Sequence, residues 1–265
     1  MLISFSLDNI ASFKEAQNLT LEVSPLKKDN FLSENTIQAD NQDEVLKSLL
    51  IYGANASGKT NINKAVEWLR TIVLDSYRNL EQNLLLRVMP FILDMKNVNS
   101  PSKFEVIFLQ NNIKYRYGIS VSNGEILEEW LYTTPKIRET LLFFRDKQIV
   151  EYNKSNFEEA KLFIKSGKNS DSKTKNSGTL EKTAPHIPFI SVLAVFQGKH
   201  SSNVISFFNI TKTYRSTKTN DKITYSDETT FINNVANTGV PSIDPAYYYV
   251  KSSVIKAYNT ANSTT

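Results

Sequence analysis

The distribution of hydrophobic and polar residues predicts antiparallel β-structure at the start and in the middle of the chain. Ile3, Phe5 and Leu7 alternate with polar residues, and residues 18–23 repeat this pattern. Alternation with a period of two is typical of strands with one buried face. The same period returns after residue 91 in four runs, FEVIFL, IKYRYGISV, EILEEWLY and TLLFFR, separated by short turns. They predict a meander of about four antiparallel strands.

Between these two regions the pattern changes from a strand to a helix. Residues 49–52, LLIY, are continuously apolar, which suits a strand buried on both faces. After Thr60 the apolar residues recur at spacings of three and four, which predicts a long helix with one apolar face. The residues on this face are Ile62, Ala65, Val66, Leu69, Ile72, Val73, Tyr77 and Leu80.

The pattern of hydrophobic and polar residues changes again after residue 150. Residues 156–168 predict a short helix, residues 165–182 a mobile Ser- and Lys-rich loop, and residues 185–209 one or two buried helices. From residue 211 onward the chain is polar and weakly patterned. We therefore expect three parts: residues 1–150, residues 151–210 with the loop and the helices, and residues 211–265.

Composition narrows the function classes. The chain has 265 residues, a formal net charge of +4 and no cysteine, which excludes disulfides, thiol-ligated metals and a cysteine nucleophile. The longest apolar run, residues 189–196, is too short to span a bilayer. The N-terminus has no basic leader. We expect a cytoplasmic protein without a membrane segment, whose mildly basic charge permits an acidic partner.

The loop between the predicted strand and helix carries the clearest chemistry. Residues 53–60 match the phosphate-loop pattern G-x-x-x-x-G-K-[ST] in full. Its glycines let backbone N–H groups turn toward a phosphate, and the positive end of the helix faces the same anion. Lys59 would reach the outer phosphates as the catalytic charge, and Thr60 would be a magnesium ligand. The residues expected to hold ATP and Mg²⁺ are Gly53, Ala54, Asn55, Ala56, Ser57, Gly58, Lys59, Thr60 and Asn61.

Residues 5–23 and 49–69 together resemble the N-terminal half of ABC-type ATPase heads of the SMC, RecF and OLD kind. The closest likeness is to bacterial ATPases of anti-phage and abortive-infection systems. It is carried by the Asn9-x-x-Ser12-Phe13-Lys14 segment, by Asn55 and Asn61, and by later pieces such as residues 104–121 and 128–132. The likeness covers residues 1–210 and is strongest up to residue 146.

This resemblance implies an α/β fold, the N-terminal lobe of an ABC-type head. In it, the phosphate-loop strand and helix lie beside an antiparallel β-meander, and a helical insertion follows. It also implies that ATP is sandwiched between two heads, so that the chain is a homo-oligomer or is completed by a second lobe. The activity would control a partner effector, a nuclease or a toxin.

The residues that such heads use to hydrolyse ATP are not evident. A Walker B site needs an apolar strand that ends in acidic residues, and none of the acidic pairs meets this requirement. No Leu-Ser-x-Gly signature is present, neither histidine follows a Walker B strand, and the magnesium-sensing glutamine cannot be selected. These candidates are Asp43-Glu44, Glu128-Glu129, Asp227-Glu228, His186, His200, Gln110, Gln148 and Gln197.

Two other functions stay open. A DNA-repair or chromosome-handling head would keep the same phosphate site and bind DNA, whereas an interaction protein would keep the loop only as a remnant. The basic cluster Lys212, Tyr214, Arg215, Lys218 and Lys222 could contact nucleic acid, although a solvated strand or loop explains it more simply. The strand-spaced Tyr115, Tyr117, Trp130 and Tyr132 could stack on bases, and sheet packing is again the simpler interpretation.

Overall fold

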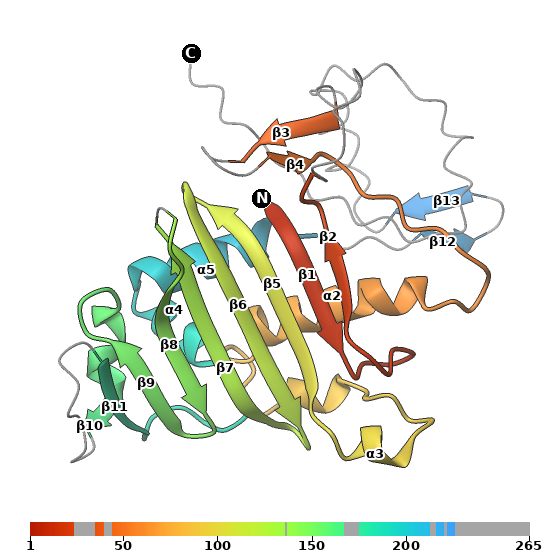
Figure 1. Cartoon of the computed structure of the whole chain (residues 1–265). Helices are drawn as coiled ribbons and strands as arrows, with labels where there is room; N and C mark the ends of the chain where they lie inside the picture. Colours follow the sequence, from red (N-terminus) through yellow and green to blue (C-terminus); the bar gives the residue numbers. More distant parts are fainter. Residues whose placement is uncertain are drawn as a thin grey trace.

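The computed structural model describes residues 1–23, 35–39, 44–135, 137–166, 175–212, 216–219 and 222–225. Its largest element is a nine-stranded sheet in which every pair of neighbouring strands is antiparallel. The strand order is β10-β11-β9-β8-β7-β6-β5-β1-β2 (Figure 1). The strands are β1 (Leu2–Asp8), β2 (Gln17–Thr20), β5 (Ser102–Gln110), β6 (Ile113–Ser122), β7 (Glu125–Thr134), β8 (Thr140–Asp146), β9 (Ile149–Asn153), β10 (Ile164–Ser166) and β11 (Lys175–Leu180).

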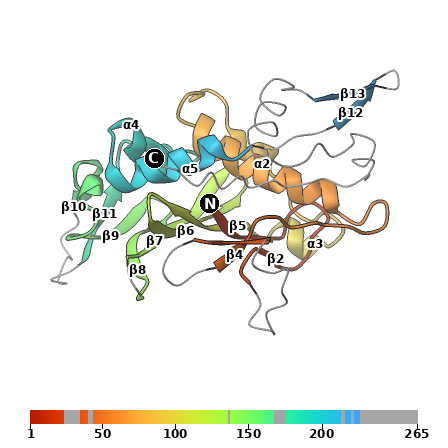
Figure 2. The same cartoon turned by 90° about the horizontal axis from the view of Figure 1, so that it is seen from above.

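Three helices cover one face of this sheet: α2 (Lys59–Asp75), α4 (Phe189–Val195) and α5 (Lys199–Ile210), as Figure 2 shows from above. Among the described residues, none of the helices combines the length and the apolar character needed to cross a membrane. The smaller elements are η1 (Leu84–Arg87), α3 (Met95–Val98), η2 (Glu158–Phe163), and the paired strands β3 (Thr36–Gln38) with β4 (Glu44–Leu46) and β12 (Ser216–Thr219) with β13 (Lys222–Tyr225).

The core lies between the helices and the sheet because each element has one apolar face. The predicted stripe of α2 is buried from Ile62 to Val73. On the sheet, Phe108 of β5 and Tyr115 of β6 are fully buried, and Phe108 stacks on Phe207 of α5 with ring centroids 4.0 Å apart. The predicted antiparallel strands are therefore confirmed, and so is the pair of buried helices after residue 185.

A polar contact fixes α5 to α2. The Arg70 side chain extends from the middle of α2, and its Nε donates to the carbonyl oxygens of Phe208 (3.1 Å) and Thr211 (2.7 Å). Carbonyl groups in the last turn of a helix lack intrahelical partners, so a cation is stabilising there. This contact joins the second half of α2, the helix that begins at the phosphate loop, to the end of α5.

The predicted strand at residues 49–52 is not formed, which corrects the strand–loop–helix unit expected from the sequence. The described residues provide no strand beside this segment, and a strand needs a neighbour to satisfy its backbone groups. Leu49 and Ile51 pack partly against the core, whereas the side chains of Leu50 and Tyr52 are 62 % and 83 % exposed. Partly buried and exposed side chains thus alternate along this segment, as in a strand, but the segment is not part of a sheet.

Two further boundaries differ from the sequence-based expectation. Helix α2 ends at Asp75, short of Tyr77 and Leu80. The predicted loop at residues 165–182 contains the end of β10 and all of β11, which extends the sheet beyond β9, while residues 167–174 lie outside the described part of the chain. The division of the chain near residues 150 and 210 stays a prediction.

Candidate phosphate-binding site

The phosphate loop lies at the β2 edge of the sheet, where α2 begins (Figure 1). Gly53 to Ser57 are exposed, and Gly58 is buried as the N-cap of α2 with φ 93°. A Cβ atom on Gly58 would lie 2.8 Å from both the Phe13 ring and the Ser12 hydroxyl oxygen. Glycine is therefore required here by its backbone conformation and by the space available.

The Lys59 side chain folds back across the loop. Its Nζ donates to the carbonyl oxygens of Gly53 (2.8 Å) and Ala54 (2.6 Å) and contacts the Ser57 hydroxyl at 3.1 Å. These contacts are exposed to solvent, so the net free energy of each one is small. An ammonium group held in this way brings a positive charge to the mouth of the loop.

No side-chain cap closes the N-terminus of α2, and its first turn has no acidic residue. The first N–H groups of a helix have no intrahelical partner and carry the positive end of the helix dipole. In the described part of the chain no carboxylate accepts from them. The loop therefore combines a positive helix end, a lysine ammonium and exposed backbone amides, which is an arrangement suited to an anion.

The N-termini of α4 and α5 are closed by carboxylates from elsewhere in the fold. Glu129 of β7 accepts from the backbone N–H groups of Phe189 (2.7 Å) and Ile190 (3.0 Å). Glu159 of η2 does the same for α5, from His200 (3.1 Å) and Ser201 (2.9 Å). Burial raises the pKa of Glu159, and the N–H groups partly offset this effect.

The remaining predicted residues of the site lie within the same turn. Asn61 donates from Nδ2 to the Ser12 hydroxyl oxygen at 2.9 Å, which joins α2 to the turn after β1. Thr60 is exposed at the helix start, and Asn55 is exposed at the tip of the loop. In the part of the chain that the structure covers, no hydrogen bond occupies the side chain of either residue, so both are accessible to a ligand.

The acidic pair Glu128-Glu129 is not a Walker B site. Glu129 is fully buried, 3.3 Å from the Arg145 guanidinium, and caps α4. Burial raises its pKa, and the neighbouring Arg145 opposes that rise. A magnesium ligand must be reachable by the ion, and this carboxylate is not. Of the other two pairs, Asp43 and both members of Asp227-Glu228 lie outside the described residues.

Of the histidine and glutamine candidates, His200 and Gln148 have structural contacts. His200 Nδ1 lies 2.9 Å from the Tyr115 hydroxyl, and burial lowers the pKa of this histidine. Gln148 accepts from Arg145 (3.0 Å) and donates to the carbonyl oxygen of Thr183 (2.8 Å). Among the described residues, no group of three or more acidic or histidine side chains could hold a metal ion.

The candidates for nucleic-acid contact are dispersed. Tyr115 and Tyr117 are buried under the helices, whereas Trp130 and Tyr132 occupy the opposite face of the sheet, Trp130 donating to Glu105 at 2.8 Å. The Arg116 guanidinium lies 4.0 Å from the centre of the Tyr132 ring. Packing therefore accounts for these aromatic residues. Of the basic cluster, Lys212 is exposed, Tyr214 and Arg215 lie outside the described residues, and nothing is described of the side chains of Lys218 and Lys222.

Sequence reasoning missed the structural roles of two buried charged residues in strands, Glu129 and Arg145, and of the partly buried Glu159 in η2. A charge in a strand ordinarily indicates a solvent-facing position, and nothing in the local pattern marked these side chains as inward. The only usable signal was the absence of Ser, Thr, Asp or Asn at the starts of α4 and α5, where Pro188 and Gly198 are the N-caps.

A glycine-rich phosphate loop that ends at the open N-terminus of an amphipathic helix, in a mixed α/β fold, is the feature of P-loop ATPases. A family model described as "AAA domain, putative AbiEii toxin, Type IV TA system" matches residues 48–241, and the chain belongs to this family. The resemblance to P-loop ATPases of abortive-infection systems is thereby confirmed. No curated protein and no solved structure matches the chain.

Proposed function

We propose that the chain binds Mg²⁺-ATP at residues 53–61 as part of an ABC-type ATPase head, and that nucleotide binding controls a partner effector, a nuclease or a toxin, in a cytoplasmic anti-phage system. The observation that carries the proposal is the open N-terminus of α2. Within the described part of the chain, no carboxylate lies at its first turn, in contrast to α4 and α5, and it begins at a complete phosphate-loop motif.

The residues present fit the phosphates and the cation. A Cβ on Gly58 would meet the turn below it, so the close backbone path depends on this glycine. Lys59 has exposed contacts that could exchange at little cost for phosphate oxygens. The Thr60 hydroxyl, which has no hydrogen bond among the described residues, would be the magnesium ligand. Bound Mg²⁺ would supply charge neutralisation next to the phosphates.

The unpaired apolar segment before the loop supports the ABC-type part of the proposal. Leu50 and Tyr52 point outward from a stretch with strand alternation, 62 % and 83 % exposed. A strand from a second lobe or from another subunit would bury these side chains and satisfy the backbone beside them. We therefore propose that the site works in an ATP-sandwich dimer or with a further lobe.

The proposal is tested by substituting Lys59→Ala and measuring ATP and Mg²⁺ binding by equilibrium dialysis. We expect binding to be abolished, because the substitution removes the ammonium charge at the mouth of the loop. Lys64→Ala, on the same helix and outside the loop, is the matched control and should bind like the unsubstituted protein. ATP should also raise the melting temperature of both binding forms and leave that of Lys59→Ala unchanged. Equal affinity of the Lys59→Ala and unsubstituted proteins would overturn the assignment.

A further inference from the structure

The turn between β1 and β2 is the part of the protein packed against the phosphate loop. Residues 10 and 13 close the turn through two backbone hydrogen bonds, Ile10 N–H to Phe13 O (3.0 Å) and Phe13 N–H to Ile10 O (2.8 Å). This closure brings Ser12 and Phe13 against Gly58, at the distances that exclude a Cβ. The Ser12 hydroxyl also accepts the hydrogen bond from Asn61. The turn thus contacts both the last glycine of the loop and the first turn of α2.

Asn9 holds this turn from behind. Its side chain is 3 % exposed, and its backbone is left-handed with φ 52°, a conformation that asparagine tolerates better than most residues. Nδ2 donates to the carbonyl oxygens of Asn97 (2.7 Å) and Ser100 (2.9 Å), while Oδ1 accepts from the N–H of Phe91 (3.1 Å). The Ser102 hydroxyl donates to the Asn9 carbonyl oxygen at 2.6 Å. One amide therefore ties the end of β1 to three points of residues 91–102.

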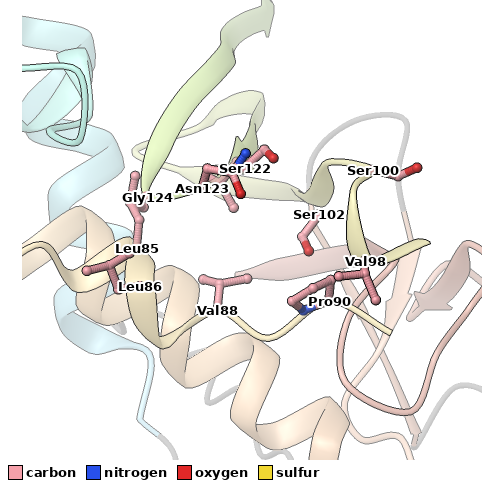
Figure 3. Close-up of a pocket in the computed structure, with 11 residues that line it drawn as sticks. Leu85, Leu86, Val88, Pro90, Val98, Ser100, Ser102, Ser122, Asn123 and Gly124 are labelled. Atoms are coloured by element: carbon pink, nitrogen blue, oxygen red, sulfur yellow. The ribbon is translucent and has the colours of Figure 1, made fainter. Parts of the chain in front are cut away.

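Further polar contacts strengthen this connection. Two more contacts run between the same segments: Ala11 N–H donates to Met89 O (2.7 Å), and Lys14 forms an exposed ion pair with Asp94 (2.9 Å). A cavity of about 150 Å³ borders residues 85–102 and the turn between β6 and β7 (Figure 3). It is lined by Leu85, Leu86, Val88, Pro90, Val98, Ser100, Ser102, Val121, Ser122, Asn123 and Gly124.

We propose that residues 9–13 are a positioning element for the phosphate loop, with Asn9 as its anchor and Ser12 as its contact to α2. None of these side chains needs to touch the nucleotide. They keep Gly58 and the first N–H groups of α2 in the arrangement that receives phosphate, so their loss weakens binding through the loop. The expected effect of these residues on ATP binding rests on the proposed function. Their expected effect on the conformation of the loop rests only on the contacts described above.

A double-mutant cycle tests the contact between Ser12 and Asn61. We expect Ser12→Ala and Asn61→Ala each to weaken binding of a fluorescent ATP analogue by roughly two- to tenfold, as for one lost hydrogen bond. The double variant should be no weaker than the weaker single variant, because one interaction is lost in all three. Ser6→Ala removes a similar exposed hydrogen bond, from Ser6 on β1 to Asn18 on β2 (3.0 Å), and should leave affinity unchanged. Strictly additive losses at Ser12 and Asn61 would overturn the coupling.

Hydrogen exchange in the nucleotide-free protein separates this inference from the proposed function. Ser12→Ala and Asn9→Asp should speed amide exchange in residues 57–63, the latter because it sets a carboxylate against backbone carbonyl oxygens, while exchange in β6 and β7 stays unchanged. Unsubstituted protein that fails to bind ATP would sink the proposed function and leave this measurement valid. Unchanged exchange in residues 57–63 of Ser12→Ala would overturn the positioning role.

Discussion

Helices α2, α4 and α5 cover the same face of the sheet, but their N-termini have different surroundings. At α4 and α5 a carboxylate from another element, Glu129 of β7 or Glu159 of η2, accepts hydrogen bonds from two N–H groups of the first turn. At α2 the corresponding space is occupied by an exposed glycine-rich loop and by a lysine that binds its own backbone. Helices α4 and α5 are therefore capped by carboxylates of the protein, whereas the N-terminus of α2 is suited to an anionic ligand.

The difference separates structural from functional use of the same electrostatics. A helix N-terminus is stabilised by any anion close to it, typically by a fraction of a kcal/mol to about 2 kcal/mol when the site is partly buried. A carboxylate of the protein contributes this stability whether or not a ligand is present, and it blocks other anions. An open N-terminus gives up that contribution in the free protein, and a phosphate recovers it on binding. Each prediction below alters one of the three helix starts.

The largest effect is expected from Glu129→Ala. The substitution uncaps α4 and leaves the fully buried Arg145 guanidinium without its ion-pair partner, so we expect a loss of about 3–5 kcal/mol in the free energy of unfolding. Equilibrium urea unfolding measures it. A loss below about 1 kcal/mol would show that the carboxylate does not hold α4 in place.

A second variant distinguishes the cap from the ion pair. In Glu129→Leu combined with Arg145→Met, no unpaired charge remains, so the cost of the unpaired guanidinium should be removed. The loss of the α4 cap, about 1 kcal/mol, and of the hydrogen bonds made by Arg145 and Tyr117 should persist. If the double variant is as unstable as Glu129→Ala, the cap and these hydrogen bonds have a larger role than the charge pair.

A carboxylate introduced into the first turn of α2 should make its N-terminus resemble those of α4 and α5. In Thr60→Asp the new charge lies in the first turn, where it should stabilise the free protein by roughly 0.3–1 kcal/mol. The same charge would repel phosphates and replace the magnesium-ligand hydroxyl, so ATP binding should weaken more than tenfold. Thermal unfolding and dialysis measure the two effects. Thr60→Asn, which is neutral and similar in shape, should give no stabilisation; an equal gain in both variants would contradict the electrostatic explanation.

The strands and the helices were largely predictable, because their signals are local. The alternation in Ile3, Phe5 and Leu7 and the stripe of α2 each describe one element with one buried face, and the structure buries those faces. The strand predicted at residues 49–52 was wrong for a reason that no local pattern contains. An apolar run forms a strand only where another strand is placed beside it, and the described fold places none there.

The candidate site also combines features that the local sequence predicts with features that only the fold shows. The loop was found from consecutive residues, since its chemistry depends on the order Gly, Lys, Thr. The turn at Asn9 matched a family motif, but its contacts with Asn97 and Ser100 join positions about 90 residues apart, which spacing does not reveal. Glu129 was considered as an acidic residue for magnesium. Only the fold shows that its charge faces Arg145 and α4.

The smallest effect concerns the pH dependence of the α5 cap. Burial raises the pKa of Glu159 above its ordinary value of 4.5, so the folded state binds this proton more tightly than the unfolded state does. Its contribution to stability is therefore greatest at low pH and decreases as the pH rises from that ordinary value through the folded pKa. In Glu159→Gln this decrease should disappear, so the difference between the unfolding free energies of the two proteins should change across mildly acidic pH.

The neighbouring Glu158 is exposed, and Glu158→Gln should leave the pH profile of stability unchanged. Urea unfolding at a series of pH values measures all three proteins, and parallel profiles for Glu159→Gln and the unsubstituted protein would show that the α5 carboxylate is as well solvated as an exposed one.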